Sequence, residues 1–169
     1  MKIEDLKAKV DNFSNALENI EFNRETWAEK TKPLLQQTLK QIASEYPIGW
    51  HVQTLDWDKN LEGVNITFGP TNSGIKTRTE TSVKAYTKHG GTIVFSQAYN
   101  GEVFVIILYP HVDEFVGQSE HKVLGRFAPT DITETFIVKQ VSEFLDEMVK
   151  WENATPSANI GFKTHQQED

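Results

Sequence analysis

The sequence predicts an α+β protein in which two N-terminal helices and one long C-terminal helix pack on an antiparallel meander sheet of five to six strands. Two observations support this fold class. Near both ends of the chain, apolar residues recur at steps of three and four, which is typical of amphipathic helices. Between residues 50 and 109, β-branched and aromatic residues are separated by turn signals, which is typical of strands that follow one another in a sheet.

The first helix is predicted over residues 3–20, where a single narrow apolar stripe repeats. The same positions satisfy the a and d sites of a heptad repeat, so they are also a candidate interface for a homodimer. Three heptads are few for a coiled coil, and packing against the protein's own core is therefore the favoured interpretation. The stripe residues are Ile3, Leu6, Val10, Phe13, Leu17 and Ile20.

Two further helices are predicted over residues 32–46 and 131–151. Pro33 interrupts the helical pattern, so we expect a fresh start or a kink near Lys32, with Thr31 as the N-cap.

The C-terminal helix has its own start signal. Thr130 or Asp131 can cap it, and Asp131 and Glu134 have the spacing of a capping box. Beyond this helix, residues 154–169 show neither helical nor strand periodicity. We expect a single domain over residues 1–153 and a flexible tail after it.

The strands are predicted at 50–57, 61–68, 75–88, 92–99 and 102–109, with a possible sixth at 122–127. The pair Asn100-Gly101 is a strong hairpin signal and predicts a type I′ turn, which needs positive φ at both residues. Residues 103–108 are apolar on both faces. We therefore expect this strand at the centre of the sheet, with helices on one side and other packed side chains on the other.

Composition limits the classes of function. The absence of cysteine excludes disulfides and thiolate chemistry. The chain carries 17 Lys and Arg against 24 Asp and Glu, and the resulting net charge of −7 argues against general attraction to nucleic acid. No apolar leader opens the sequence, and the longest apolar run, 103–109, is far shorter than a bilayer requires. We expect an acidic, cytoplasmic protein that does not enter the membrane.

Two segments approach catalytic motifs but fail on spacing or context. Residues 69–77 resemble a phosphate-binding loop, but Ile75 separates the second glycine from the lysine, and a strand is expected to follow instead of a helix. Residues 117–121 resemble a nucleophile elbow, but His121 stands where that turn needs glycine. We assign no catalytic residue and no cofactor, and an enzymatic function is the less favoured one.

A cluster of imidazoles and carboxylates lies between residues 111 and 121, and both groups are suitable metal ligands. The cluster lacks the helical His-Glu-x-x-His spacing that would place two ligands on one face, so we assign no metal and leave the question open. Its members are His111, Asp113, Glu114, Glu120 and His121.

The predicted strand at 75–88 places basic residues and one tyrosine on a single face by two-residue alternation. Such a face could bind nucleic acid or an acidic partner segment. Glu80 interrupts it and the whole chain is acidic, so a solvated strand face is the favoured interpretation. The candidate binding residues are Lys76, Arg78, Lys84, Tyr86 and Lys88.

The leading interpretation is a non-enzymatic intracellular interaction protein, of adaptor, chaperone-like or inhibitor type, that binds a protein partner. It follows from the failed catalytic motifs, the heptad stripe and the acidic last third of the chain. The alternative is a small apolar-ligand-binding protein with a cavity between the sheet and the C-terminal helix, since aromatic residues make up 11% of the chain. Weak nucleic-acid binding through the basic strand face is the second alternative.

Overall fold

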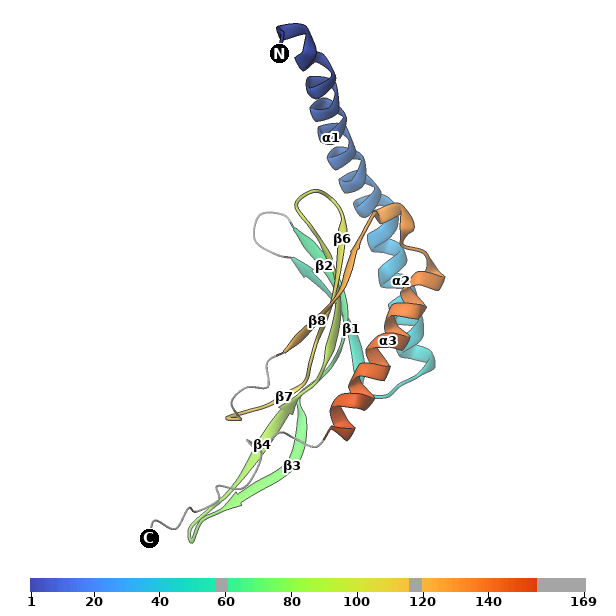
Figure 1. Ribbon diagram of the computed structural model, residues 1–169. Coiled ribbons are helices and arrows are strands. Elements are labelled where there is room, and N and C mark those ends of the chain that lie inside the picture. The colour runs from blue at the N-terminus through green and yellow to red at the C-terminus, as the bar shows by residue number, and fades with distance from the viewer. Residues whose placement is uncertain (57–60, 116–119, 155–169) are drawn as a thin grey trace, which may run out of the picture.

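A five-stranded antiparallel sheet stands at the centre of the molecule, with helices on one of its faces (Figure 1). The computed structural model describes residues 1–56, 61–115 and 120–154. A smaller three-stranded sheet extends from one end of the central sheet, and a long helix projects beyond the other end (Figure 1). The predicted α+β fold class is confirmed. Residue 57, residues 117–119 of the elbow-like segment and the predicted tail beyond residue 154 lie outside the described residues.

The central sheet has the strand order β1-β2-β5-β6-β8, and all neighbouring strands run antiparallel. Its strands are β1 (Trp50–Asp56), β2 (Glu62–Phe68), β5 (Thr92–Gln97), β6 (Val103–Leu108) and β8 (His121–Phe127). The smaller sheet has the order β3-β4-β7 and consists of β3 (Thr71–Arg78), β4 (Val83–His89) and β7 (His111–Val112). The meander is therefore interrupted between β2 and β5, where β3 and β4 leave the central sheet.

The prediction of one long strand over residues 75–88 is wrong. The chain turns back between Thr79 and Ser82, where the Thr79 amide donates to the Ser82 carbonyl at 2.8 Å. The Thr79 hydroxyl also accepts from the Ser82 amide at 3.1 Å, so the side chain stabilises the turn. Threonine and serine suit both strands and turns, and the alternation of residue types alone did not separate the two.

The hairpin predicted at Asn100-Gly101 is confirmed, because it joins β5 to β6. Its turn type is not the predicted one, since Gly101 has a positive φ of 80° whereas Asn100 does not. The Asn100 side chain instead accepts from the Glu102 amide at 3.1 Å, which holds the turn without a second left-handed residue.

The core lies between the central sheet and the helices. Alternate residues of each strand point toward the helices, as the pleat of a sheet requires. The fully buried side chains include Val64, Ile66, Ile93, Phe95, Val103, Val105 and Ile107 from the sheet and Leu35, Leu39, Ile137 and Phe144 from the helices.

Strand β6 lies inside the sheet, between β5 and β8, and not at its centre. The helices cover one of its faces, as predicted. On the opposite face, Phe104 and Ile106 are half-buried and Leu108 is 42% exposed, whereas Val94, the partner of Ile106 in β5, is only 5% exposed. Side chains therefore pack on this face as well, but less closely than on the face that the helices cover.

The two predicted N-terminal helices form one continuous helical segment. It consists of η1 (Ile3–Leu6), α1 (Lys7–Thr26), the π-helical turn η2 (Trp27–Thr31) and α2 (Lys32–Glu45). Pro33 lacks an amide hydrogen and crowds the preceding turn, and the wider turn just before it accommodates this without ending the helix. The predicted N-cap is wrong, since the Thr31 hydroxyl donates to the Pro129 carbonyl at 3.1 Å.

The C-terminal helix, α3 (Glu134–Asn153), begins three residues later than predicted. Residues 129–131 form a separate 3-10 turn, η4 (Pro129–Asp131), so neither Thr130 nor Asp131 is the cap. The cap is Thr133, whose hydroxyl accepts from the Phe136 amide at 3.1 Å. None of the described helices combines the length and the apolar character that a membrane span requires.

Candidate functional site

The N-terminal part of the long helix carries the apolar stripe and projects from the body of the protein, which consists of the two sheets and the helices α2 and α3 (Figure 1). Every residue from 1 to 19 is exposed, so the expected packing of this stripe on the protein's own core is wrong for residues 3–17. Only Ile20, the last member, is half-buried. The exposed fractions are 86% for Ile3, 46% for Leu6, 59% for Val10, 65% for Phe13 and 52% for Leu17.

The turn between β5 and β6 fixes the direction in which α1 leaves the body. A Cβ at Gly101 would lie 2.5 Å from the Cβ of Asn23, so only glycine allows this close approach. The Arg24 guanidinium donates to the Tyr99 carbonyl at 2.5 Å and lies 5.0 Å from the centroid of the Tyr99 ring. The contacts hold the base of α1, and the stripe beyond it is presented to solvent.

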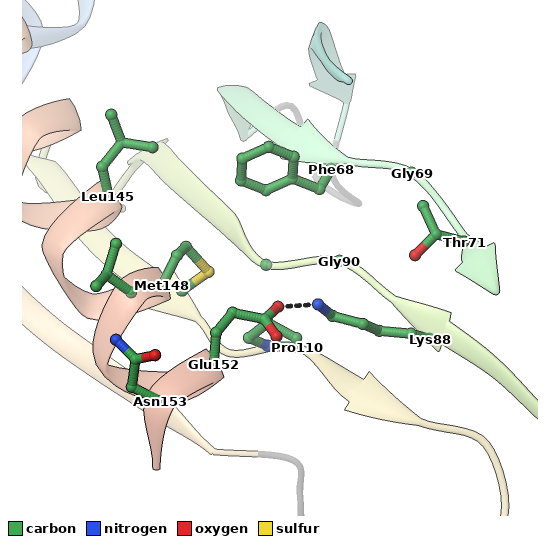
Figure 2. Close-up of a pocket in the computed structure, with 12 residues that line it drawn as sticks. Phe68, Gly69, Thr71, Lys88, Gly90, Pro110, Leu145, Met148, Glu152 and Asn153 are labelled. Atoms are coloured by element: carbon green, nitrogen blue, oxygen red, sulfur yellow. Dashed lines mark hydrogen bonds and ion pairs between the residues drawn. The ribbon is translucent and has the colours of Figure 1, made fainter. Parts of the chain in front are cut away.

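A second candidate site is a cavity of about 430 Å³ between the sheets and the C-terminal end of α3. Its apolar lining comes from Phe68 of β2 on one side and from Leu145 and Met148 of α3 on another, as Figure 2 shows. Gly90 and Gly91 also line the cavity and lie directly against Phe68 and Met148, since a Cβ at either glycine would come within 2.2 Å of the respective side chain. The cavity lies where the alternative interpretation placed one, between sheet and C-terminal helix, and its volume is within the usual range for small-molecule sites.

Lys88 and Glu152 form an ion pair at the polar edge of this cavity (Figure 2). The Lys88 ammonium also lies 5.2 Å from the centroid of the Trp151 ring. Burial lowers the pKa of Lys88, although the neighbouring carboxylate acts in the opposite direction. The cavity thus offers an apolar wall and one poorly solvated cation.

The basic residues proposed for a single strand face lie on both faces of the β3–β4 hairpin. The register pairs Lys76 with Ala85 and Arg78 with Val83, which places these two cations on one face. Lys84, Tyr86 and Lys88 alternate onto the other face, where the Tyr86 hydroxyl lies 3.1 Å from the Thr77 hydroxyl. Lys84 is paired with Glu114 and Lys88 with Glu152. The five residues form no continuous basic stripe, and nucleic-acid binding stays a prediction.

Beside the cavity, Glu147 of α3 is 8% exposed and joins three side chains. Its carboxylate accepts from Lys150 Nζ at 2.8 Å, from the Tyr109 hydroxyl at 2.5 Å and from Lys122 Nζ at 3.1 Å. These hydrogen bonds, of which the one from Lys150 has the largest effect, lower the pKa of Glu147 to about 2. Desolvation, followed by the bond to Glu147, raises the pKa of Tyr109 to about 12. The cluster joins α3 to the sheet through an ionised carboxylate, two lysines and the neutral Tyr109 hydroxyl.

The structure divides the predicted metal-ligand cluster. His111 and Asp113 lie beside His89 of β4, and the three possible ligand atoms are within 4.8 Å of one another. His89 Nε2 is 2.8 Å from an Asp113 oxygen. The two imidazoles stack with their planes 18° apart, so their nitrogens do not point toward one centre, and metal binding would require a ring to rotate.

The remaining members of that cluster lie apart from His89. Glu114 pairs with Lys84, whereas Glu120 and His121 line a hollow of about 250 Å³ beside His111.

Sequence reasoning missed the residues that make the cavity. Gly90 and Gly91 fall between the strands predicted at 75–88 and 92–99, and two adjacent glycines beside a strand also signal a close approach of backbone. Met148 lies within the helix predicted over residues 131–151, and nothing in an apolar helix pattern distinguishes a core position from a cavity wall.

No family model, curated protein or solved structure matches this chain, so these surfaces carry the functional argument alone.

Proposed function

We propose that the protein is an interaction protein that binds a helical protein partner along the apolar stripe of α1. The observation that carries the proposal is the exposure of this stripe on a helix that leaves the body. An apolar surface of this kind, contiguous and bordered by charged residues, marks an interaction site in a soluble protein. Its partner should present a matching apolar helix face, because a narrow a/d stripe fits another helix better than it fits a sheet or a pocket.

Helix energetics support a partner for this segment. Helical stability in proteins comes mainly from packing of the apolar face, and an isolated helix of about 15 residues is marginal in water. Residues 3–19 have no such packing among the described residues. Burial of each exposed apolar side chain contributes on the order of 1–2 kcal/mol. A helical partner would therefore stabilise α1 and be bound by the same contacts.

The test replaces two central stripe residues. Val10→Gln with Phe13→Gln should abolish binding of the helical partner, and amide hydrogen exchange across residues 7–19 should become faster than in the unmodified protein. The matched control is Ala8→Gln with Asn15→Gln, on the opposite face of the same helix. Both variants should keep the melting temperature of the body, since residues 1–19 do not pack on it.

The readouts are native mass spectrometry and affinity capture with identification of the captured chain. A protein that stays monomeric and alone, with equally fast exchange across residues 7–19 in all three forms, would refute the proposal.

The cavity supports a second candidate function, the binding of a small ligand with an apolar body and an anionic group. Phe68, Leu145 and Met148 would contact the apolar part, and Lys88 would bind the anion in place of Glu152. An ammonium that has lost much of its hydration gains more from an incoming anion than a fully solvated one does.

This candidate is tested by comparing octanoate with octanol in calorimetric titrations. Octanoate should bind more tightly, Lys88→Met should remove that preference, and Glu152→Gln should strengthen octanoate binding because it removes the competing carboxylate. Lys84→Met is the control, since Lys84 does not line the cavity. If neither compound binds, or if Lys88→Met leaves the preference unchanged, the cavity is not an anionic-ligand site.

A further inference from the structure

We propose that the helical partner of α1 is a second copy of the same chain, with the two α1 helices packed antiparallel. The inference rests on the proposed function, because it names the partner of the same stripe. It comes from three observations: the spacing of the stripe, the distribution of charge beside it, and the position of the body at only one end of the helix.

The stripe is self-complementary in the antiparallel direction. Its successive steps are three, four, three, four and three residues, and this series reads the same from either end. When two such helices run in opposite directions, each a position faces a d position of the other. The facing layers are Ile3 with Ile20, Leu6 with Leu17, and Val10 with Phe13, each formed twice by the two copies.

Charge beside the stripe favours the antiparallel arrangement over the parallel one. The flanking e and g positions near the N-terminus carry Lys2, Lys7 and Lys9. In a parallel pair, Lys2 of one copy would face Lys7 of the other, and like charges at these positions oppose pairing.

Antiparallel pairing places residues 2–9 of each helix, which carry a net charge of +1 because Glu4 and Asp5 offset two of the three lysines, beside residues 18–25 of the other copy, which carry −2. The acidic residues at that end are Glu18, Glu21 and Glu25. Lys7 and Lys9 then face Ser14 and Ala16 of the second copy, so no like-charged pair forms across the stripe.

The shape of the molecule permits this arrangement. Residues 3–20 span about 27 Å of helix, and the body begins where Asn23 and Arg24 meet the β5–β6 turn (Figure 1). In the antiparallel pair, the two bodies lie at opposite ends of the paired helices and do not compete for space. The half-buried Ile20 would complete the last layer with Ile3 of the second copy.

The cysteine-free chain allows a direct test of partner and direction. Leu6→Cys and Leu17→Cys are prepared as separate proteins and oxidised alone and as a mixture. The mixture should give a disulfide-linked dimer, whereas each protein alone should not, because identical residues lie about 16 Å apart in the antiparallel pair. Ala8→Cys mixed with Asn15→Cys is the matched control on the outer face and should stay unlinked.

The native mass of the unmodified protein provides the second measurement and should be twice 19.3 kDa. Efficient cross-linking of Leu6→Cys with itself would overturn the antiparallel inference and leave the proposed function intact. A strictly monomeric protein without cross-links would overturn the second copy as partner. In that case, stripe-dependent binding of a different helical protein would still support the proposed function. If no helical protein binds the stripe either, both the proposed function and the antiparallel dimer are refuted.

Discussion

The buried carboxylate of Glu147 gives a quantitative prediction. Replacement by glutamine keeps the shape of the side chain and removes its charge. The pKa of Glu147 is lowered from 4.5 to about 2, a difference of about 2.5 units, which corresponds to about 3.4 kcal/mol without screening. Lys150 is 71% exposed and Lys122 38% exposed, so water screens much of the interaction. We expect Glu147→Gln to reduce the free energy of unfolding at pH 7 by about 1–2 kcal/mol.

The pH dependence follows from the direction of the shift. A carboxylate with a lowered pKa in the folded state stabilises the fold fully above its unfolded pKa, near 4.5, and this contribution is lost as the pH falls through about 2. The difference between the unmodified protein and Glu147→Gln should therefore be constant from pH 7 to about 5 and shrink below about 4.5. Urea unfolding, followed by tryptophan fluorescence at fixed protein concentration, measures this difference at each pH.

Glu143→Gln is the matched control, because Glu143 also pairs with Lys122, at 3.0 Å, but its side chain is 40% exposed. Exposed ion pairs contribute little, and a loss below about 0.5 kcal/mol is expected for this variant. The reasoning is refuted if both variants lose the same stability, or if the loss in Glu147→Gln does not change between pH 7 and pH 3.

Three further predictions concern single packing or capping contacts, each measured by urea unfolding. Thr133→Ala removes the hydroxyl that caps α3 and should cost about 1 kcal/mol; an unchanged midpoint would contradict the assigned cap. Gly90→Ala and Gly91→Ala should each reduce the free energy of unfolding by about 1–3 kcal/mol, with the larger loss for Gly90→Ala. The new methyl group meets β2 backbone at Gly90 but only the flexible Met148 side chain at Gly91. Trp27→Phe replaces the buried indole by a smaller phenyl ring and removes its 3.1 Å hydrogen bond to the Glu62 carboxylate; it should cost about 1–3 kcal/mol and lower the native tryptophan fluorescence by the contribution of Trp27.

The boundaries that sequence reasoning misplaced have a common cause. Threonine and serine hydroxyls bond to nearby backbone, and the sequence does not show which partner they choose. At Thr79 such a bond made a turn inside an expected strand, and at Thr31 the hydroxyl reached Pro129 instead of the helix start. Thr133 became the cap of α3 because residues 129–131 formed a turn of their own.

For the candidate sites, too, the sequence predicted local features, whereas their surroundings depended on the fold. Local periodicity predicted the stripe on α1 correctly, since a repeat of three and four residues defines a helix face without reference to the rest of the chain. Whether that face is covered depends on where the body ends, and only the fold shows that residues 3–17 project from it. The basic residues at 76–88 were divided between two faces by a turn that alternation alone did not reveal.

By itself, the sequence determined the α+β class, the three helical segments, most of the strands and the hairpin at Asn100-Gly101, because each of these follows from contacts between residues close together in the chain. The tertiary structure decided which segments distant in the sequence are in contact. It removed β3 and β4 from the central sheet, brought Lys88 to Glu152 across 64 positions, and left the α1 stripe exposed. Such contacts join distant segments, and their geometry depends on how the whole chain packs.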